Sequence, residues 1–384
     1  MSKKIYILLI FCFPLLISAT INLPYYIPKS YEIRKTDSPR AFIVAGIHGD
    51  EIGGYLSAVY LYKKLKLSKG DIKFIPFLNI KSIVRTYRYL EGVGDVNEKF
   101  VFSNKNELSI PEDVFNKINF VKKELINFKP DFVLSFHSGW GFSYNDRRRW
   151  GNSITIDEKK HGQIDLYTVA FKVLSEINRN NRYKRVKYSI KILNTFSNNV
   201  VRDMNDFSTW VLKNNIPVFT IESSKNSVLW RQIYNISFAT LEFLKIYGFK
   251  VSNVDEILDP MNIRKFLKSI RRNNLKFKIY INGVSKEYKC GYKQKLNIFV
   301  NKNANIVVPD IELNDVGYFL VPYSEINYKH SYNFYRKIMF KIKFLVVYDI
   351  LCKLEKWDNL LGNTPQIPTP GGKNGTTEDF TRPS

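Results

Sequence analysis

The sequence predicts an α/β fold, with a mainly parallel mixed sheet flanked by helices, followed by a small all-β domain. Between residues 41 and 247, short apolar segments alternate with longer segments that have helical spacing, as in a parallel sheet with crossover helices. From Ile263 onward, period-two alternation replaces the helical spacing. The chain has 384 residues, of which 45% are hydrophobic, so it can bury a large core.

The α/β domain is expected to span residues 22–250. Its strands are predicted at residues 41–46, 71–79, 131–137 and 217–222. Its helices are predicted at residues 53–67, 111–128, 166–178, 207–214 and 228–247. Residues 81–106 have no clean periodicity and many polar, glycine and tyrosine residues, which favours a functional loop.

Residues 1–19 have the pattern of a secretory signal peptide. Lys3 and Lys4 precede an apolar run, and Ser18-Ala19 supplies the small residues of a cleavage site. The run is too short for a comfortable membrane span, so no stable span is expected after cleavage. Export would leave Cys290 and Cys352 either as a disulfide or as two free thiols.

A small basic β domain is expected at residues 263–325. The segment 275–281 alternates apolar and polar residues and meets Asn282-Gly283, a strong hairpin signal. Between Arg264 and Lys302 there are twelve lysine or arginine residues and one acid, consistent with a solvated basic surface or with a platform for an anionic polymer. Residues 326–361 form an apolar segment of uncertain structure, and residues 362–384 are expected to be a disordered tail.

The formal net charge of +24 favours acidic partners. We expect no nucleic-acid partner, because the chain is exported and has no recognition motif for nucleic acid. Anionic cell-wall polymer or an anionic membrane face matches the charge better, although a lysine-rich background composition would produce the same value.

Three residues that can bind metal or move protons share one setting. His48, His137 and Glu222 each lie at or just past the carboxyl end of a predicted strand, where open α/β sheets place their ligands. Glu51 lies three residues after His48, close enough for both side chains to reach one metal ion. An isolated His-x-x-Glu pair is equally consistent with a surface turn, but the other two strand ends argue for a shared site.

Two histidines and one glutamate with an open fourth position are a donor set of catalytic zinc. We therefore predict that His48, Glu51 and His137 bind one Zn²⁺ per chain. Glu222 would remain free to act as general base on water at that ion.

The order of these motifs resembles the zinc metallocarboxypeptidase (funnelin) family. The matching motifs cover about residues 41–247 and are His48-x-x-Glu51, Gly94-Asp95-Val96-Asn97, a strand ending in His137-Ser138, and Thr220-Ile221-Glu222. The resemblance implies the same zinc ligands and assigns Glu222 as general base and acid. It also implies an arginine that stabilises the oxyanion, for which Arg88 is the best match and Arg85 the alternative.

One departure from the family concerns the terminal carboxylate of the substrate. The family usually has Asn-Arg where this chain has Asn97-Glu98, and a glutamate there would repel a free carboxylate. Lys99 or the cluster Arg147–Arg149 would then anchor the substrate, unless that cluster is a solvated turn; alternatively the substrate end carries a cation that pairs with Glu98. The tyrosine that many members have near the scissile bond is absent from residues 196–210.

With its signal peptide and basic β domain, the chain looks most like the periplasmic peptidoglycan D,L-carboxypeptidases that determine helical cell shape. This resemblance implies a periplasmic enzyme that removes meso-diaminopimelate from tripeptide stems of peptidoglycan, remodelling the cell wall. The alternatives are an exported metallopeptidase or amidase that acts on other peptides or acyl-amino acids, and a non-catalytic peptidoglycan-binding protein.

Overall fold

The fold comes from a computed structural model that describes residues 28–36, 38–85, 87–89, 93–101, 110–180, 187–196 and 205–272, and short strands between residues 275 and 351. Side chains are described only as far as residue 269, with a few exceptions before it. The expected signal peptide, residues 1–19, and the expected tail, residues 362–384, lie outside the described residues.

A seven-stranded sheet forms the centre of the α/β domain, in the order β1-β4-β2-β5-β10-β6-β9. Its strands are β1 (Tyr31–Ile33), β2 (Arg40–Ala45), β4 (Asp71–Ile75), β5 (Phe132–Gly139), β6 (Ser153–Ile156), β9 (Ser189–Ile192) and β10 (Val218–Ser224). The four central strands β4, β2, β5 and β10 are parallel, whereas β1 and β6 pair with their inner neighbours antiparallel. The predicted mainly parallel mixed sheet is thus confirmed.

The helices of the domain are α1 (Ile52–Lys64), α2 (Ile80–Arg85), α3 (Glu112–Phe128), α4 (Leu166–Asn180), α5 (Phe207–Lys213), α6 (Leu229–Ile246), α7 (Val254–Ile257) and α8 (Pro260–Arg272), with the 3₁₀ helix η1 (Asn97–Lys99). Two small ribbons join β3 (Leu67–Lys69) to β11 (Lys250–Val251) and β7 (Lys160–His161) to β8 (Ile164–Asp165). All predicted helices and strands of this domain are present, with ends shifted by a few residues.

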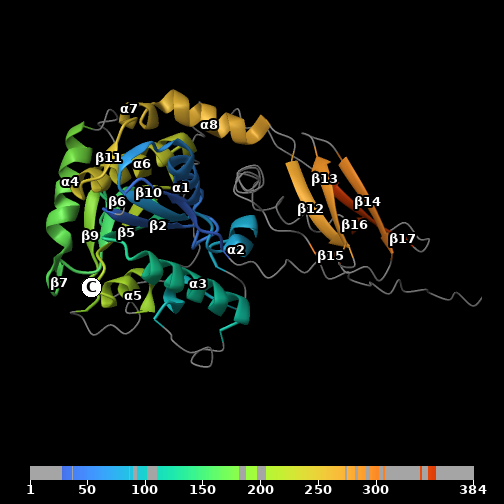
Figure 1. Ribbon diagram of the computed structural model, residues 1–384, viewed down its shortest axis with the longest axis horizontal. Helices are drawn as coiled ribbons and strands as arrows, with labels where there is room; N and C mark the ends of the chain where they lie inside the picture. The colour runs from blue at the N-terminus through green and yellow to red at the C-terminus, as the bar shows by residue number, and fades with distance from the viewer. Residues whose placement is uncertain are drawn as a thin grey trace, which may run out of the picture.

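The helices lie on both faces of the sheet. Phe42 of β2 and Phe132 of β5 are one register position apart, so their side chains point to opposite faces. Phe42 contacts Phe128 of α3, whereas Phe132 stacks near Phe243 of α6. Helix α1 packs beside α6, and α5 lies near α3, as the two groups of helices in Figure 1 show.

The buried core extends past the expected limit at residue 250. Ile263, Phe266 and Leu267 of α8 are buried, and Phe266 packs on Tyr60 of α1 at 5.1 Å between ring centroids. The Tyr60 hydroxyl also donates to the carbonyl of Ile257 at 3.0 Å. The residues from 263 that we assigned to the start of the β domain therefore form a helix of the α/β core, because its apolar face completes the packing on α1 and α6.

Short strands follow α8. The expected hairpin is confirmed, since β12 (Leu275–Ile281) pairs antiparallel with β13 (Val284–Cys290). The remaining strands are β14 (Lys295–Asn301), β15 (Ile306–Val307), β16 (Ile338–Met339) and β17 (Leu345–Leu351). Strand β17 pairs with β14 and β16, so the segment 326–361 contributes two strands to a sheet with β14, whereas β12 and β13 belong to another sheet with β15. None of the helices within the described residues combines the length and the apolar character needed to cross a membrane.

Candidate metal centre and its cavity

The first half of the site is the turn between β2 and α1. Strand β2 is buried and ends at Ala45, and α1 begins at Ile52, so His48 and Glu51 occupy the connection at the carboxyl edge of the sheet. The turn is packed closely against α2 and the residues just after it. The Gly49 amide donates to the carbonyl of Tyr87 at 3.0 Å, and a Cβ at Gly49 would lie 2.0 Å from the Ser82 carbonyl oxygen. Glycine is therefore needed where the turn meets this segment.

The second half comes from β5 and β10. His137 lies near the carboxyl end of β5, and Glu222 is its direct register partner on β10. Partners in parallel strands point to the same face, so both side chains stand side by side on the face that α3 and α5 cover. The prediction that these strand ends meet is confirmed.

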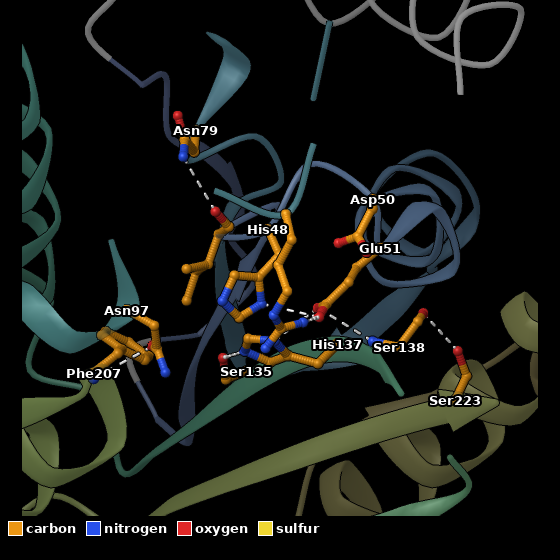
Figure 2. A network of polar contacts seen from close by, with 12 residues as sticks. His48, Asp50, Glu51, Asn79, Asn97, Ser135, His137, Ser138, Phe207 and Ser223 are labelled. Atoms are coloured by element: carbon orange, nitrogen blue, oxygen red, sulfur yellow. Dashed lines mark hydrogen bonds and ion pairs between the residues drawn. The ribbon is translucent and has the colours of Figure 1, made fainter. Parts of the chain in front are cut away.

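His48, Glu51 and His137 converge on one point. Nδ1 of His48 lies 2.9 Å from Oε1 of Glu51, and Nδ1 of His137 lies 2.8 Å from Oε2. The three donor atoms lie within 4.8 Å of one another, and each residue is at most 5% exposed. Figure 2 shows both imidazoles turned toward the Glu51 carboxylate. One carboxylate and two inward nitrogens fit a metal ion, which would replace the protons that now join them.

The outer nitrogen of each imidazole has a partner of its own. Nε2 of His48 lies 2.9 Å from Oδ1 of Asp95, and Nε2 of His137 lies 2.9 Å from Oγ of Ser135. Such contacts fix the ring orientation and tautomer of metal ligands. No role was predicted for Asp95 or Ser135 from the sequence, although Ser135 stands two residues before His137 on the same face of its strand.

The charges of the cluster are mutually stabilised. Burial raises the pKa of Glu51, but the charges of His48 and His137 outweigh it and hold the pKa well below its ordinary value. Burial lowers the pKa of His48, yet Glu51 and Asp95 raise it to about 9. Glu51 is therefore a carboxylate at neutral pH, as a metal ligand must be.

Glu222 has the properties of a proton carrier. Its side chain is 8% exposed, and its Oε2 is buried with no hydrogen-bond partner among the residues that the structure describes. Burial, reinforced by the negative charge of Glu51, raises the pKa of Glu222 to about 7. A carboxyl group with a pKa near the working pH can both accept and release a proton.

The predicted arginine and substrate residues lie around the same cavity. Nη1 of Arg88 pairs with Oε1 of Glu51 at 2.5 Å, and its side chain is 42% exposed. Arg85 ends α2, but its side chain lies outside the described residues. Asn97 and Glu98 line the cavity, and Oδ1 of Asn97 accepts from the Phe207 amide at 3.4 Å.

The cavity has a volume of about 390 Å³. Its lining includes Tyr89, which contacts His48 edge-on at 6.1 Å between ring centroids and was not predicted. Arg148 and Arg149 also line it, with side chains 90% and 58% exposed and both paired to Asp146. Of the stretch 196–210, where the family tyrosine was sought, residues 197–204 lie outside the described residues.

Comparison with known proteins identifies the family. Residues 1–265 match the family model described as the catalytic part of the carboxypeptidase controlling helical cell shape. The chain belongs to this family. Its model covers the α/β domain through α7 and ends within α8, at Lys265.

Solved structures of Csd4, the cell shape determinant of Helicobacter pylori, have the same fold. The tripeptide-bound form has a TM-score of 0.56 and 22% identity, with 68% of this chain and 64% of that chain covered. The meso-diaminopimelate-bound form, titled a D,L-carboxypeptidase, has a TM-score of 0.54 and 23% identity, with 68% and 62% covered. The matches thus span less than two thirds of the Csd4 chains. No curated protein matches the sequence.

Proposed function

We propose that this chain is a zinc-dependent D,L-carboxypeptidase of the periplasm that trims peptidoglycan. It would remove the C-terminal meso-diaminopimelate from tripeptide stems and leave dipeptides. The observation that carries the proposal is a metal-fitting triad beside Glu222, whose buried Oε2 has no partner among the described residues. The family supports a carboxypeptidase, and the Csd4 structures bound to tripeptide and to meso-diaminopimelate support the substrate class.

Zinc held by His48, Glu51 and His137 would polarise the scissile carbonyl and lower the pKa of the attacking water. Glu222 takes the proton from that water and later gives it to the departing amine. Its pKa of about 7 suits both transfers. Glu222 is the register partner of His137 in the sheet. The backbone hydrogen bonds between β5 and β10 therefore hold the proposed base at a fixed position relative to this metal-binding histidine.

Arg88 supplies positive charge to the developing oxyanion. Its guanidinium already lies against Glu51 at the edge of the cavity, and one such donor commonly contributes about 3 kcal/mol. Asn97 is fixed through its Oδ1 by the Phe207 amide, which leaves its Nδ2 donors for the terminal carboxylate of the substrate.

The test is mass spectrometry of purified muropeptides before and after incubation with zinc-loaded protein. We expect tripeptide stems to become dipeptides with release of meso-diaminopimelate, and a chelator to stop the reaction. Glu222→Gln should lower kcat by a factor of about 10³ while the zinc content, measured by elemental analysis, stays at the wild-type level. Loss of zinc from this variant would instead place Glu222 among the ligands.

Other outcomes would contradict the proposal. Cleavage of ordinary peptides or acyl-amino acids without any cleavage of muropeptides would identify a different exported amidase. Binding to insoluble peptidoglycan without turnover by the zinc-loaded protein would identify a non-catalytic wall-binding protein.

A further inference from the structure

Two carboxylates in the cavity have no role in the proposed reaction. Asp157 follows β6 and is 1% exposed, and Asp206 is the N-cap of α5. Both line the cavity that also contains His137 and Glu222. Within the described part of the chain, neither forms an ion pair with a lysine or arginine, so their negative charges have no cationic partner there.

Hydrogen bonds hold the two carboxylates close to each other. Thr209 connects them, because its amide donates to Oδ1 of Asp206 at 2.7 Å and its hydroxyl donates to Oδ1 of Asp157 at 3.3 Å. The hydroxyl of Thr195 also donates to Oδ1 of Asp157, at 2.8 Å. Burial, reinforced by the charge of Asp157, raises the pKa of Asp206 to about 7.

The fold itself does not require the negative charges. An asparagine at either position would accept the same hydrogen bonds through its side-chain oxygen, and asparagine caps a helix as well as aspartate does. It would also avoid placing the charge of the partly buried Asp206 close to that of the buried Asp157, which is unfavourable. Buried charge that the fold does not need, inside a cavity, is typical of a binding or catalytic site.

A third acceptor lies next to the pair. Thr155 lies near the end of β6, two residues before Asp157, and both residues line the cavity. Thr155 is 5% exposed and lines the cavity, and its Oγ1 has no hydrogen-bond partner among the described residues. Its register partner on β10 is Thr220, which lies two residues before Glu222. Thr155 therefore lies beside the strand that carries Glu222.

We propose that Asp157, Asp206 and Thr155 form a subsite for a primary ammonium group on the side chain of the residue that is released. The inference rests on the proposed function and identifies the side-chain ammonium as the feature of the substrate that this chain selects. An ammonium carries one positive charge and three donors. The subsite offers two carboxylates and the Thr155 hydroxyl oxygen, which has no partner in the described part of the chain. Meso-diaminopimelate carries such a side-chain ammonium.

The position of the subsite agrees with the expected placement of the substrate. Asn97, which we assign to the terminal carboxylate, contacts the amide of Phe207, the residue after Asp206. A terminal residue bound at Asn97 therefore has the acidic pair next to it. Glu98, the cation partner considered from the sequence, also lines the cavity and is partly buried, as Asp206 is, but Asp206 is linked through Thr209 to a second carboxylate, the fully buried Asp157.

A divalent metal ion fits the subsite less well. Ca²⁺ takes six to eight oxygen ligands, whereas the pair and Thr155 provide few free lone pairs, because threonine hydroxyls already donate to Asp157. The chemistry of the acceptors therefore favours an ammonium.

The test compares two tripeptide stems that differ only in the terminal residue. One ends in meso-diaminopimelate, and the other ends in 2-aminopimelate, which keeps the distal carboxylate and lacks the distal amine. For the zinc-loaded full-length protein we expect kcat/KM to be at least about 10-fold higher for the first stem, as for a charge-assisted hydrogen bond. The double variant Asp157→Asn/Asp206→Asn should lose this preference, measured as the ratio of kcat/KM for the two stems.

The matched control is Asp255→Asn on α7, an exposed carboxylate outside the cavity, which should keep the preference. A second measurement separates recognition from a structural role. If the carboxylates serve recognition, the double variant should have a higher Tm at pH 8 than the wild type. If they were needed for the fold, the Tm would fall.

Each remaining outcome has one meaning. Equal kcat/KM for both stems in the wild type, or an unchanged preference in the double variant, overturns the subsite and leaves the carboxypeptidase assignment intact. If the wild type cleaves neither stem, the proposed function fails, and calorimetric binding of the two stems then decides the subsite alone. Calorimetric binding of Ca²⁺ that the double variant abolishes would replace the ammonium with a metal ion.

Discussion

At the scale of single residues, the orientation of each imidazole depends on a partner that never contacts the metal. Asp95 accepts from Nε2 of His48 at 2.9 Å. Asp95→Ala should lower zinc affinity by a factor of about 10 to 100, measured by competition with a chromogenic chelator. Asp95→Asn keeps an acceptor and should lose less. Equal affinities of all three proteins would show that His48 is held by other contacts.

A pH dependence follows from Asp206. Its pKa is raised from 3.8 to about 7 in the folded protein, first by burial and then by Asp157. The folded state therefore binds more protons than the unfolded state between these values, and stability should fall as the pH rises through this window.

Asp206→Asn removes this loss. Its Tm should exceed that of the wild type by a few degrees at pH 8, corresponding to about 1–2 kcal/mol, and the difference should shrink toward pH 4. A gain of equal size at both pH values, in melts followed by circular dichroism, would contradict the argument.

Some residues of the site could be predicted from the sequence and others could not. His48, His137 and Glu222 could, because each follows an apolar strand, and the carboxyl ends of parallel strands meet at one edge. Asp157 and Asp206 could not, because they come together only through tertiary packing, in which Thr209 of α5 contacts both.

At the scale of elements, the conformation of the turn between β2 and α1, which carries His48 and Glu51, depends on its close contact with the segment that follows β4. A Cβ at Gly49 would meet backbone atoms of Ser82 at 2.0 Å, which cannot move as a side chain can. Gly49→Ala should destabilise the protein by about 2–4 kcal/mol and weaken zinc binding, because the turn carries His48 and Glu51.

Gly162→Ala is the comparison for this substitution. Gly162 has a φ of +55° but nothing within 4 Å of the added Cβ, so the substitution should cost only about 1 kcal/mol and leave zinc affinity unchanged. Similar losses in both variants, from urea unfolding and zinc titration, would show that the crowding at Gly49 has no special effect.

The elements with strong periodicity were predicted, and several short strands were missed. Strand β9, with the sequence Ser-Ile-Lys-Ile, is half-buried and only four residues long, and β6 is of the same length. Segments of this length carry little pattern, and their strand conformation comes from pairing with β10 and with each other.

At the scale of the whole molecule, the catalytic unit needs the segment after residue 250. Its helix α8 was assigned from sequence to the basic β domain, because its charged residues mask an apolar face that contains Ile263, Phe266 and Leu267. A chain shortened after residue 272 should unfold cooperatively and bind zinc like the full protein.

A chain shortened after residue 250 should lose about 3 kcal/mol or more, since Tyr60 and its neighbours become exposed to water. Chemical unfolding of the two shortened proteins measures the difference. Equal stability would mean that α8 lies on the core without supporting it.

The register of β5 against β10 has one more consequence. His137 and Glu222 are opposite each other in the same ladder, so their separation is set by the spacing of hydrogen-bonded strands, about 4.8 Å. Backbone geometry thus fixes the distance between one metal-binding position, His137, and the proposed base, Glu222. Loops beyond the strand ends can change in length and sequence without altering that spacing, and a lineage of such proteins can acquire new substrates while the distance on which hydrolysis depends stays constant.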